Sequence, residues 1–176
     1  CPLCPTGQGR KERQKGMMSL DTFEIIMNQI GKYLYTVRLD SWGEPLLNKE
    51  IFQIIRCAAG YGIKVSFSTN LNVLGDEEAE QLVSSGLSEL LVSMDGATQD
   101  TYQQYRRGGN LQTVIENIGK IQHFKKALHR KTPKISALFL VMRHNEHEIE
   151  AVKALAKQLK IETIIGPLRV DTGREI

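Results

Sequence analysis

Two cysteines at the start of the sequence are the first residues with a recognisable chemistry. Cys1 and Cys4 form the segment Cys-Pro-Leu-Cys, which Pro5, Thr6 and Gly7 follow. Two thiolates on one tight turn can ligate a metal centre together. The spacing alone fits zinc binding, disulfide exchange or part of an iron–sulfur site, and it does not choose among them.

Two further segments place polar residues directly after candidate strands. Gly43 and Glu44 lie in Ser-Trp-Gly-Glu-Pro-Leu, where glycine permits close backbone approach and the carboxylate can accept from an ammonium group. Ser93 and Asp95 lie in Ser-Met-Asp-Gly-Ala-Thr, and Arg106 follows on the next predicted helix. Taken singly, these residues are more typical of turns and solvated helix surface than of a binding site.

Weaker candidates stand at the ends of other strands. Ser68 and Asn70 lie in Ser-Thr-Asn, and Leu168 lies within 166–169 at the end of the last strand. Asn145 precedes the final helix, where a capping role is the favoured interpretation.

The elements that must position these residues alternate between strands and helices. We predict strands over Tyr35 to Ser41, Lys64 to Thr69, Glu89 to Met94, Ile135 to Met142 and Thr163 to Val170. Their near-continuous apolar character predicts burial on both faces. The first and last would leave sheet edges unpaired near Tyr35 and Thr163.

Helical periodicity fills the intervals between the strands. The predicted helices are Ser19 to Lys32, Lys49 to Ala59, Asp76 to Ser85, Thr98 to Tyr105, Leu111 to Leu128 and Asn145 to Leu159. Ser19 is the expected cap of the first, and Asn145 with Glu148 has capping-box spacing at the last. This alternation builds a parallel sheet, either doubly wound or in a barrel, with the chemistry at the carboxyl ends of the strands.

Together the motifs resemble those of the radical S-adenosylmethionine (SAM) superfamily. Cys1 and Cys4 look like the second and third cysteines of its Cys-x-x-x-Cys-x-x-Cys motif, whose first cysteine would lie upstream of Cys1. The resemblance implies a partial (β/α)6 TIM-like barrel without its first strand, and a 4Fe–4S cluster on three thiolates with one iron open to SAM. It favours one incomplete core domain over 1–176, of the SPASM-type subgroup whose C-terminal extension carries auxiliary clusters.

The same resemblance implies roles for the remaining motif residues. Gly43 and Glu44 would bind the methionine amino group of SAM, and Arg106 would pair with its carboxylate. Ser93 and Asp95 would hydrogen-bond the ribose hydroxyls. The residues that would lie beside SAM or near its adenine are Ser68, Asn70, Asn145 and Leu168.

The implied reaction passes one electron from the cluster to SAM and yields a 5′-deoxyadenosyl radical that abstracts hydrogen from a peptide or small-molecule substrate. It implies anaerobic activity and an electron donor such as flavodoxin or ferredoxin. The alternatives are a zinc-binding or redox-active α/β module and a degenerate, non-catalytic scaffold. The sequence does not identify the substrate.

The composition mainly excludes several classes of protein. The 176 residues fit one domain, and a net charge of +3 argues against a nucleic-acid partner. Apolar runs are too short for a membrane span, and three cysteines are too few for a disulfide framework, so we expect a cytoplasmic protein. Cys57 is the expected small buried hydrophobe, His144 and His147 should be exposed, and the basic runs over 10–15 and 125–134 should be solvated.

Overall fold

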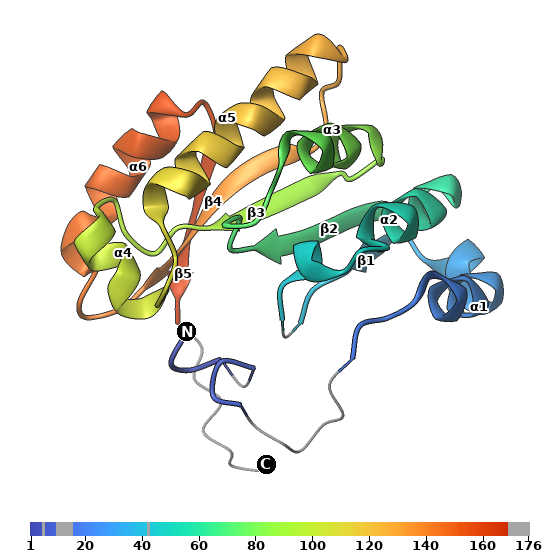
Figure 1. Cartoon of the computed structure of the whole chain (residues 1–176), viewed down its shortest axis with the longest axis horizontal. Helices are drawn as coiled ribbons and strands as arrows, with labels where there is room; N and C mark the ends of the chain where they lie inside the picture. Colours follow the sequence, from blue (N-terminus) through green and yellow to red (C-terminus); the bar gives the residue numbers. More distant parts are fainter. Residues whose placement is uncertain (5, 10–15, 42, 169–176) are drawn as a thin grey trace.

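The strands form a single open, parallel sheet. The computed structural model describes residues 1–4, 6–9, 16–41 and 43–168. The strands are β1 (Thr36–Arg38), β2 (Lys64–Thr69), β3 (Glu89–Ser93), β4 (Lys134–Val141) and β5 (Glu162–Pro167), in the order β1-β2-β3-β4-β5 (Figure 1). Because every neighbour is parallel and the order never reverses, the sheet has the topology of part of a β/α barrel. The predicted fold class is confirmed.

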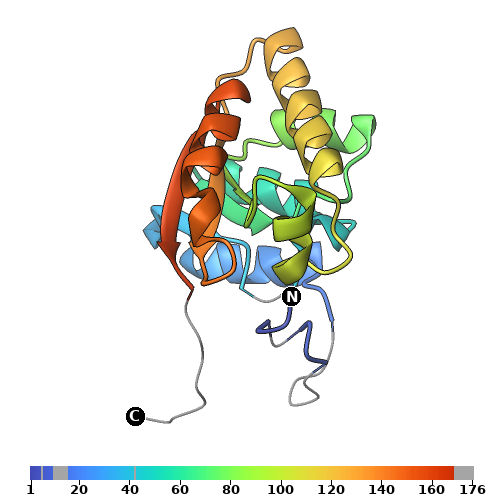
Figure 2. The same ribbon diagram turned by 90° about the vertical axis from the view of Figure 1, so that its left-hand side faces the viewer.

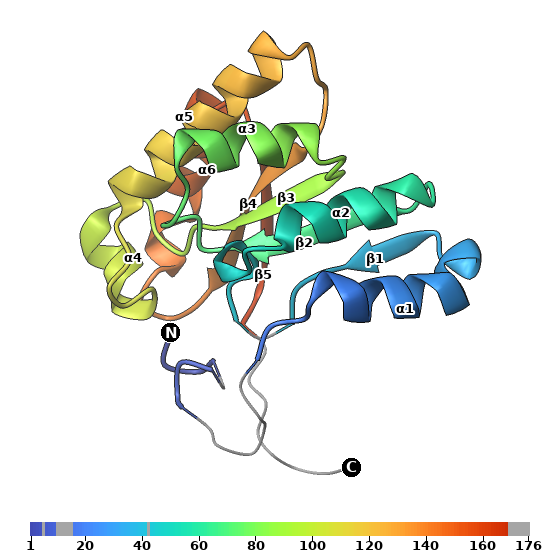
Figure 3. The ribbon, with the colours of Figure 1, turned by 45° about the vertical axis from the view of Figure 1, so that its right-hand side comes forward.

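Helices follow the strands in sequence order along one face of the sheet (Figure 3). They are α1 (Leu20–Ile30), α2 (Ile51–Gly60), α3 (Asp76–Ser84), α4 (Gln99–Tyr105), α5 (Leu111–Ala127) and α6 (Ile149–Gln158), with short turns η1 (Gly31–Tyr33), η2 (Pro45–Leu47) and η3 (Glu146–Glu148). Helices α5 and α6 stand side by side (Figure 2). Gln122 of α5 donates to the carbonyl of Leu159, at the end of α6. All six predicted helices are present.

Side-chain caps begin several of these helices. Ser19 Oγ accepts from Thr22 N–H at 3.2 Å, which confirms the predicted cap of α1. Asn110 Oδ1 accepts from Thr113 N–H at 3.0 Å and begins α5. The interval between β3 and β4 thus holds two helices, α4 and α5, as the glycines at 108 and 109 predict.

The core lies between the helices and one face of the central strands. Alternate residues such as Val65 and Phe67 in β2, and Leu90 and Val92 in β3, are fully buried there. The opposite face is more open: Ser66 and Ser68 are only half-buried. Burial on both faces is therefore a wrong prediction for much of the sheet, because no second layer covers that face within the described residues.

The outer strands β1 and β5 also differ from the prediction. Strand β1 is shorter than predicted, and Ile164 of β5 is 42% exposed. Strand β5 begins at Glu162 and ends at Pro167, while Arg169 and Val170 lie outside the described residues. In the described part of the chain, β1 and β5 each pair on one side, which confirms the predicted unpaired edges.

Two predictions about single residues are wrong. Cys57 is only half-buried, because it packs at the margin of the core on α2. His144 is not exposed: it is half-buried in the loop after β4, and its Nε2 has almost no solvent access and no hydrogen-bond partner. His147 is exposed as predicted. No described helix is both long and apolar enough to cross a membrane.

Candidate functional site

The predicted site residues gather at the carboxyl edge of the sheet. Loops after β1, β2, β3 and β4 meet there, and the N-terminal cysteine loop (residues 1–4 and 6–9) lies against the same edge, below α4 and β5 (Figure 1). Parallel strands end at one edge, so segments distant in sequence become neighbours.

The cysteine loop is a tight turn with two free thiols. Cys4 N–H donates to the Cys1 carbonyl at 3.2 Å, and Gln8 N–H donates to the Cys4 carbonyl at 2.9 Å. A Cβ at Gly7 would lie 2.5 Å from the Cys1 carbonyl oxygen, so the turn requires glycine there. Both cysteines are half-exposed and free. They are therefore accessible to a ligand from solvent.

The side chains of the cysteine loop are of the type that binds an iron–sulfur cluster, and Cys1 and Cys4 provide two thiolates. Cys1 and Cys4 share one turn, and thiolates are the ligands that iron–sulfur clusters use. Among the described residues, no group of three or more His, Cys, Asp or Glu side chains is placed to hold a metal ion. A cluster on this loop requires a further ligand.

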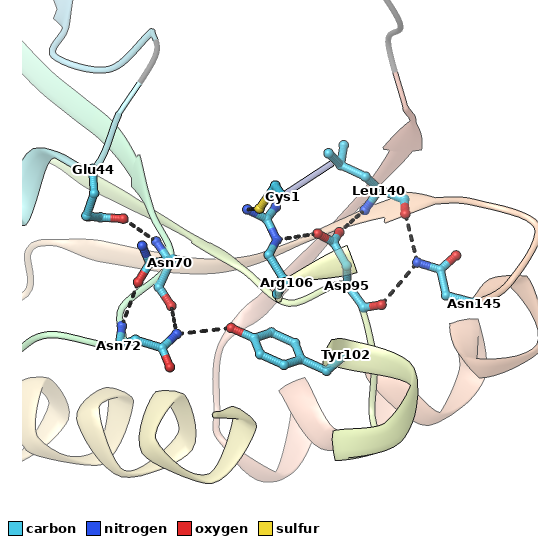
Figure 4. A network of polar contacts seen from close by, with 9 residues as sticks. All are labelled: Cys1, Glu44, Asn70, Asn72, Asp95, Tyr102, Arg106, Leu140 and Asn145. Atoms are coloured by element: carbon cyan, nitrogen blue, oxygen red, sulfur yellow. Dashed lines mark hydrogen bonds and ion pairs between the residues drawn. The ribbon is translucent and has the colours of Figure 1, made fainter. Parts of the chain in front are cut away.

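A buried ion pair connects the loop after β3 with the cysteine loop. Arg106, at the carboxyl end of α4, donates from Nε to Asp95 Oδ2 at 2.6 Å and from Nη1 to Cys1 Sγ at 3.5 Å (Figure 4). Asp95 has no exposed side-chain surface, and its Oδ1 accepts from Leu140 N–H at 2.8 Å. Both carboxylate oxygens thus already have partners within the protein.

Asn145 fixes the same loop from β4. Its Nδ2 donates to the carbonyls of Asp95 and Leu140, at 3.1 and 3.0 Å, and its Oδ1 accepts from Met142 N–H at 2.7 Å. It is completely buried and makes no capping hydrogen bond. The predicted helix cap is wrong, because the side chain turns inward to join β3 and β4.

Glu148 caps a different helix from the one that its sequence position suggests. Its carboxylate accepts from Ala97 N–H at 2.6 Å and from the hydroxyls of Thr98 and Thr101 at 2.7 and 3.0 Å. Burial opposes ionisation, but these hydrogen bonds outweigh it and lower the pKa of Glu148. Glu148 therefore stabilises the start of α4, and the predicted capping box with Asn145 is wrong.

Glu44 occupies the neighbouring part of the edge. Its Oε1 accepts from Thr69 Oγ1 at 2.6 Å and from Leu46 N–H at 3.3 Å, and its Oε2 accepts from Asn70 N–H at 2.7 Å. Gly43 before it has a φ of 112°, a conformation that favours glycine. The loop after β1 is thereby attached to the end of β2. A carboxylate has about four lone-pair sites, so Glu44 can still accept from a ligand.

Two residues without an assigned role link the two parts of the site. Asn72 N–H donates to Asn70 Oδ1 at 2.9 Å, and Asn72 Nδ2 donates to the Tyr102 hydroxyl at 3.1 Å (Figure 4). Burial raises the pKa of Tyr102, so the phenol remains protonated. Glu44, Asn70, Asn72 and Tyr102 thus connect β1 and β2 with α4.

The other predicted residues lie along the same edge at different depths. Ser68 Oγ accepts from Arg38 Nη2 at 2.7 Å, and Ser93 is 5% exposed at the end of β3. Leu168 is half-buried and follows β5, which is the outer strand on the other side of the sheet from β1. The hydrogen bonds join Arg106, Asp95 and Cys1 directly, whereas Glu44 belongs to the β1–β2 part of the site.

Sequence reasoning missed Glu148 and Asn72. The partners of Glu148 lie about fifty positions away in the chain, so no local spacing reveals them. For Asn72 a local signal exists: it stands two positions after Asn70, a spacing at which asparagine amides close a turn.

Comparison with curated proteins gives enzyme relatives. The chain is 26% identical over 160 residues to the AdoMet-dependent heme synthase of Methanosarcina barkeri, a match that covers 90% of this chain and 44% of that protein. It is 40% identical over 107 residues to the GTP 3′,8-cyclase of Lactiplantibacillus plantarum, covering 58% of this chain and 32% of that protein. The chain thus spans less than half the length of these relatives.

Solved structures show the same fold at low identity. The chain superposes on Streptococcus suis SuiB bound to S-adenosylmethionine with a TM-score of 0.72 at 14% identity, covering 93% of this chain and 37% of that one. It superposes on anSMEcpe with bound AdoMet with a TM-score of 0.73 at 14% identity, covering 94% and 47% of the two chains.

Family membership rests on the sequence match. Residues 1–156 match the radical SAM superfamily, whose members bind a 4Fe–4S cluster and SAM, and this range includes the cysteine loop, Glu44, Asp95 and Arg106. Chance agreement of separate motifs does not account for a match of that length. The chain therefore belongs to the radical SAM superfamily.

Proposed function

We propose that this chain is the core of a radical SAM enzyme in which Cys1 and Cys4 are two of the three thiolate ligands of a 4Fe–4S cluster. The observation that carries the proposal is the contact of Arg106 with both Cys1 and Asp95, which joins the cysteine loop to the carboxyl edge of the sheet. When bound, such a cluster supplies the electron that cleaves SAM to methionine and a hydrogen-abstracting 5′-deoxyadenosyl radical.

The protein's own residues would bind and orient SAM along this edge. Glu44, next to Gly43, has capacity to accept from the methionine ammonium group, and Arg106 has donors left for the carboxylate. Ser93 and Asp95 would face the ribose hydroxyls, and Asp95 also holds Arg106 in place.

The remaining edge residues would line the nucleoside. Ser68 and Asn70 would lie beside SAM at the end of β2, and Leu168 would lie near the adenine after β5. This edge would hold the reacting atoms of SAM close to the substrate.

The substrate class in this proposal is a peptide or a small molecule. SuiB has been solved with the precursor peptide SuiA and anSMEcpe with the Cp18Cys peptide, while the curated relatives are named for GTP and heme chemistry. We further propose a flavodoxin-like or ferredoxin-like electron donor, SPASM-type auxiliary clusters outside this chain, a cytoplasmic location and activity only without oxygen.

The test is anaerobic reconstitution of the intact protein with iron and sulfide. When dithionite is added, we expect an electron paramagnetic resonance signal from the reduced 4Fe–4S cluster and, with SAM present, release of 5′-deoxyadenosine. C1A and C4A should lose both, whereas C57A, altered on distant α2, should keep both. Zinc without iron would support a zinc module, and an iron-free protein that still binds SAM would support a degenerate scaffold.

A further inference from the structure

The guanidinium of Arg106 contacts two chemically different groups. Its Nε lies 2.6 Å from Asp95 Oδ2, and its Nη1 lies 3.5 Å from Cys1 Sγ, across a sequence separation of 105 residues (Figure 4). The Arg106 side chain is 15% exposed, so solvent screens this contact only in part. A cation is therefore held against one of the two thiols of the cysteine loop.

The position of Arg106 is set by a buried framework. Asp95, with no exposed side-chain surface, is fixed through Oδ1 by Leu140 N–H and through its carbonyl by Asn145 Nδ2. Each of these partners is buried or half-buried at the end of β4. With Nε bound to Asp95, the planar guanidinium can turn little, so its Nη1 remains directed at Cys1.

We propose that Arg106 donates a hydrogen bond to the Cys1 thiolate when that thiolate ligates the cluster, and that Asp95 is a positioning residue that acts through Arg106. This inference rests on the proposed function. Hydrogen bonds to cluster sulfurs are one of the features that set reduction potentials. A donor and a positive charge at Cys1 stabilise the more negative, reduced cluster, so Arg106 raises the potential.

This role is compatible with a contact between Arg106 and SAM. A guanidinium has five N–H donors, of which one faces Asp95 and one faces Cys1, so donors remain for a carboxylate. A measurement without SAM isolates the contact with Cys1.

The experiment compares R106Q with R107Q in the intact, reconstituted protein without SAM. Arg107 is the exposed neighbour, so its substitution removes the same charge without removing the contact. One-electron reductive titration, followed by electron paramagnetic resonance, should show a more negative potential for R106Q and an unchanged potential for R107Q. Equal potentials for R106Q and wild type would overturn the inference, as would equal shifts in both variants.

A second variant covers loss of the cluster. If R106Q does not load iron, R106K carries the test, because one ammonium group cannot contact Asp95 and Cys1 as the planar fork does. R106K should also shift the potential to a more negative value. Failure of both variants to load, while R107Q loads, would overturn the tuning role in favour of a requirement for assembly.

The role of Asp95 is tested by combining a substitution at Asp95 with R106Q and comparing the shifts in reduction potential. If Asp95 positions Arg106, the shift caused by R106Q should shrink when it is measured in a D95N background. An undiminished shift would overturn the positioning role. Circular dichroism is the measurement that tells whether D95N folds. If instead D95N unfolds, the coupling is measured in N145A, which removes the amide that holds the Asp95 carbonyl.

The two proposals fail in different ways. A wild-type protein that forms no cluster contradicts the proposed function. If the wild-type protein forms a cluster and cleaves SAM, but R106Q has the same reduction potential, only this inference is contradicted.

Discussion

Two loops at the same edge of the sheet are built in opposite ways. The loop after β3 (residues 95–98) is attached to β4 and η3 by buried and part-buried hydrogen bonds with Leu140, Asn145 and Glu148. The cysteine loop is exposed over most of its described residues and closes mainly on itself, with Cys4 N–H bonded to the Cys1 carbonyl. Arg106 lies between them and contacts both loops.

The difference separates what the protein fixes in advance from what a ligand can complete. Groups that orient an organic ligand must be in place before it binds, and the loop after β3 has the buried support that this requires. Metal ligands commonly gain order from the metal, because binding and local folding are coupled. Stability should therefore depend strongly on the first loop and little on the second.

The strongest expected effect is that of Gly96→Ala in the loop after β3. An added Cβ would lie 2.5 Å from Tyr102 N and 2.8 Å from Tyr102 Cα, and these are backbone atoms of α4 that cannot turn aside. We expect a loss of at least about 3 kcal/mol in the free energy of unfolding, measured with urea.

Gly119 on α5 provides the matched control. Apart from its chain neighbours and the adjacent backbone of α5, no described atom lies within 4 Å of a Cβ added there. Gly119→Ala should therefore raise the free energy of unfolding by about 0.5–1 kcal/mol through helix propensity. Equal effects at the two glycines would mean that the loop after β3 is not tightly packed on α4.

Glu148→Ala is expected to have the next largest effect. It leaves Ala97 N–H and the hydroxyls of Thr98 and Thr101 without their acceptor, and the free energy of unfolding should fall by about 2 kcal/mol. Glu150→Ala is the control, because its exposed pair with Lys153 should contribute less than about 0.5 kcal/mol. A small loss at Glu148 would show that α4 begins without its help.

A smaller effect is expected on the pH dependence of the free energy of unfolding. Because the folded pKa of Glu148 is lowered, its contribution is complete above the unfolded pKa and disappears as the pH falls through the folded value. Glu148→Gln should therefore be less stable than wild type at pH 7, and the gap should narrow on acidification. Urea unfolding at pH 7 and at successively lower pH measures this gap, and a constant gap would contradict the carboxylate role.

The sequence predicts the elements better than their surroundings. Amphipathic spacing is local, so it identified α1 to α6 and the central strands. Burial of both faces of β1 and β5 depends on what covers the far side of the sheet, which periodicity does not contain, and Ile164 is exposed. Asn145 and Glu148 have capping-box spacing, but each binds a group about fifty positions away instead: Asn145 the Asp95 carbonyl and Glu148 the Ala97 N–H.

The candidate site follows the same division. Glu44, Asp95 and Arg106 were predictable because strand ends share one edge in any parallel sheet. Their hydrogen-bond partners within the protein were not: Asp95 accepts from Arg106 Nε and from Leu140 N–H, which lie 11 and 45 positions away in the chain. Hydrogen bonds between distant segments depend on tertiary structure, and no spacing within one segment encodes them.

The smallest expected effect on folding is at the cysteine loop, and it gives the sharpest contrast. Cys4→Ala should change the free energy of unfolding of the metal-free protein by less than about 0.5 kcal/mol, because Cys4 is half-exposed, but it should abolish iron binding. Cys57→Ala should do the reverse, with a loss of about 1 kcal/mol from packing on α2 and full iron content. Urea unfolding and iron analysis of the same two variants measure both quantities. If Cys4→Ala unfolds the metal-free protein as readily as Glu148→Ala does, the cysteine loop is part of the fixed framework, and the division between the two loops is wrong.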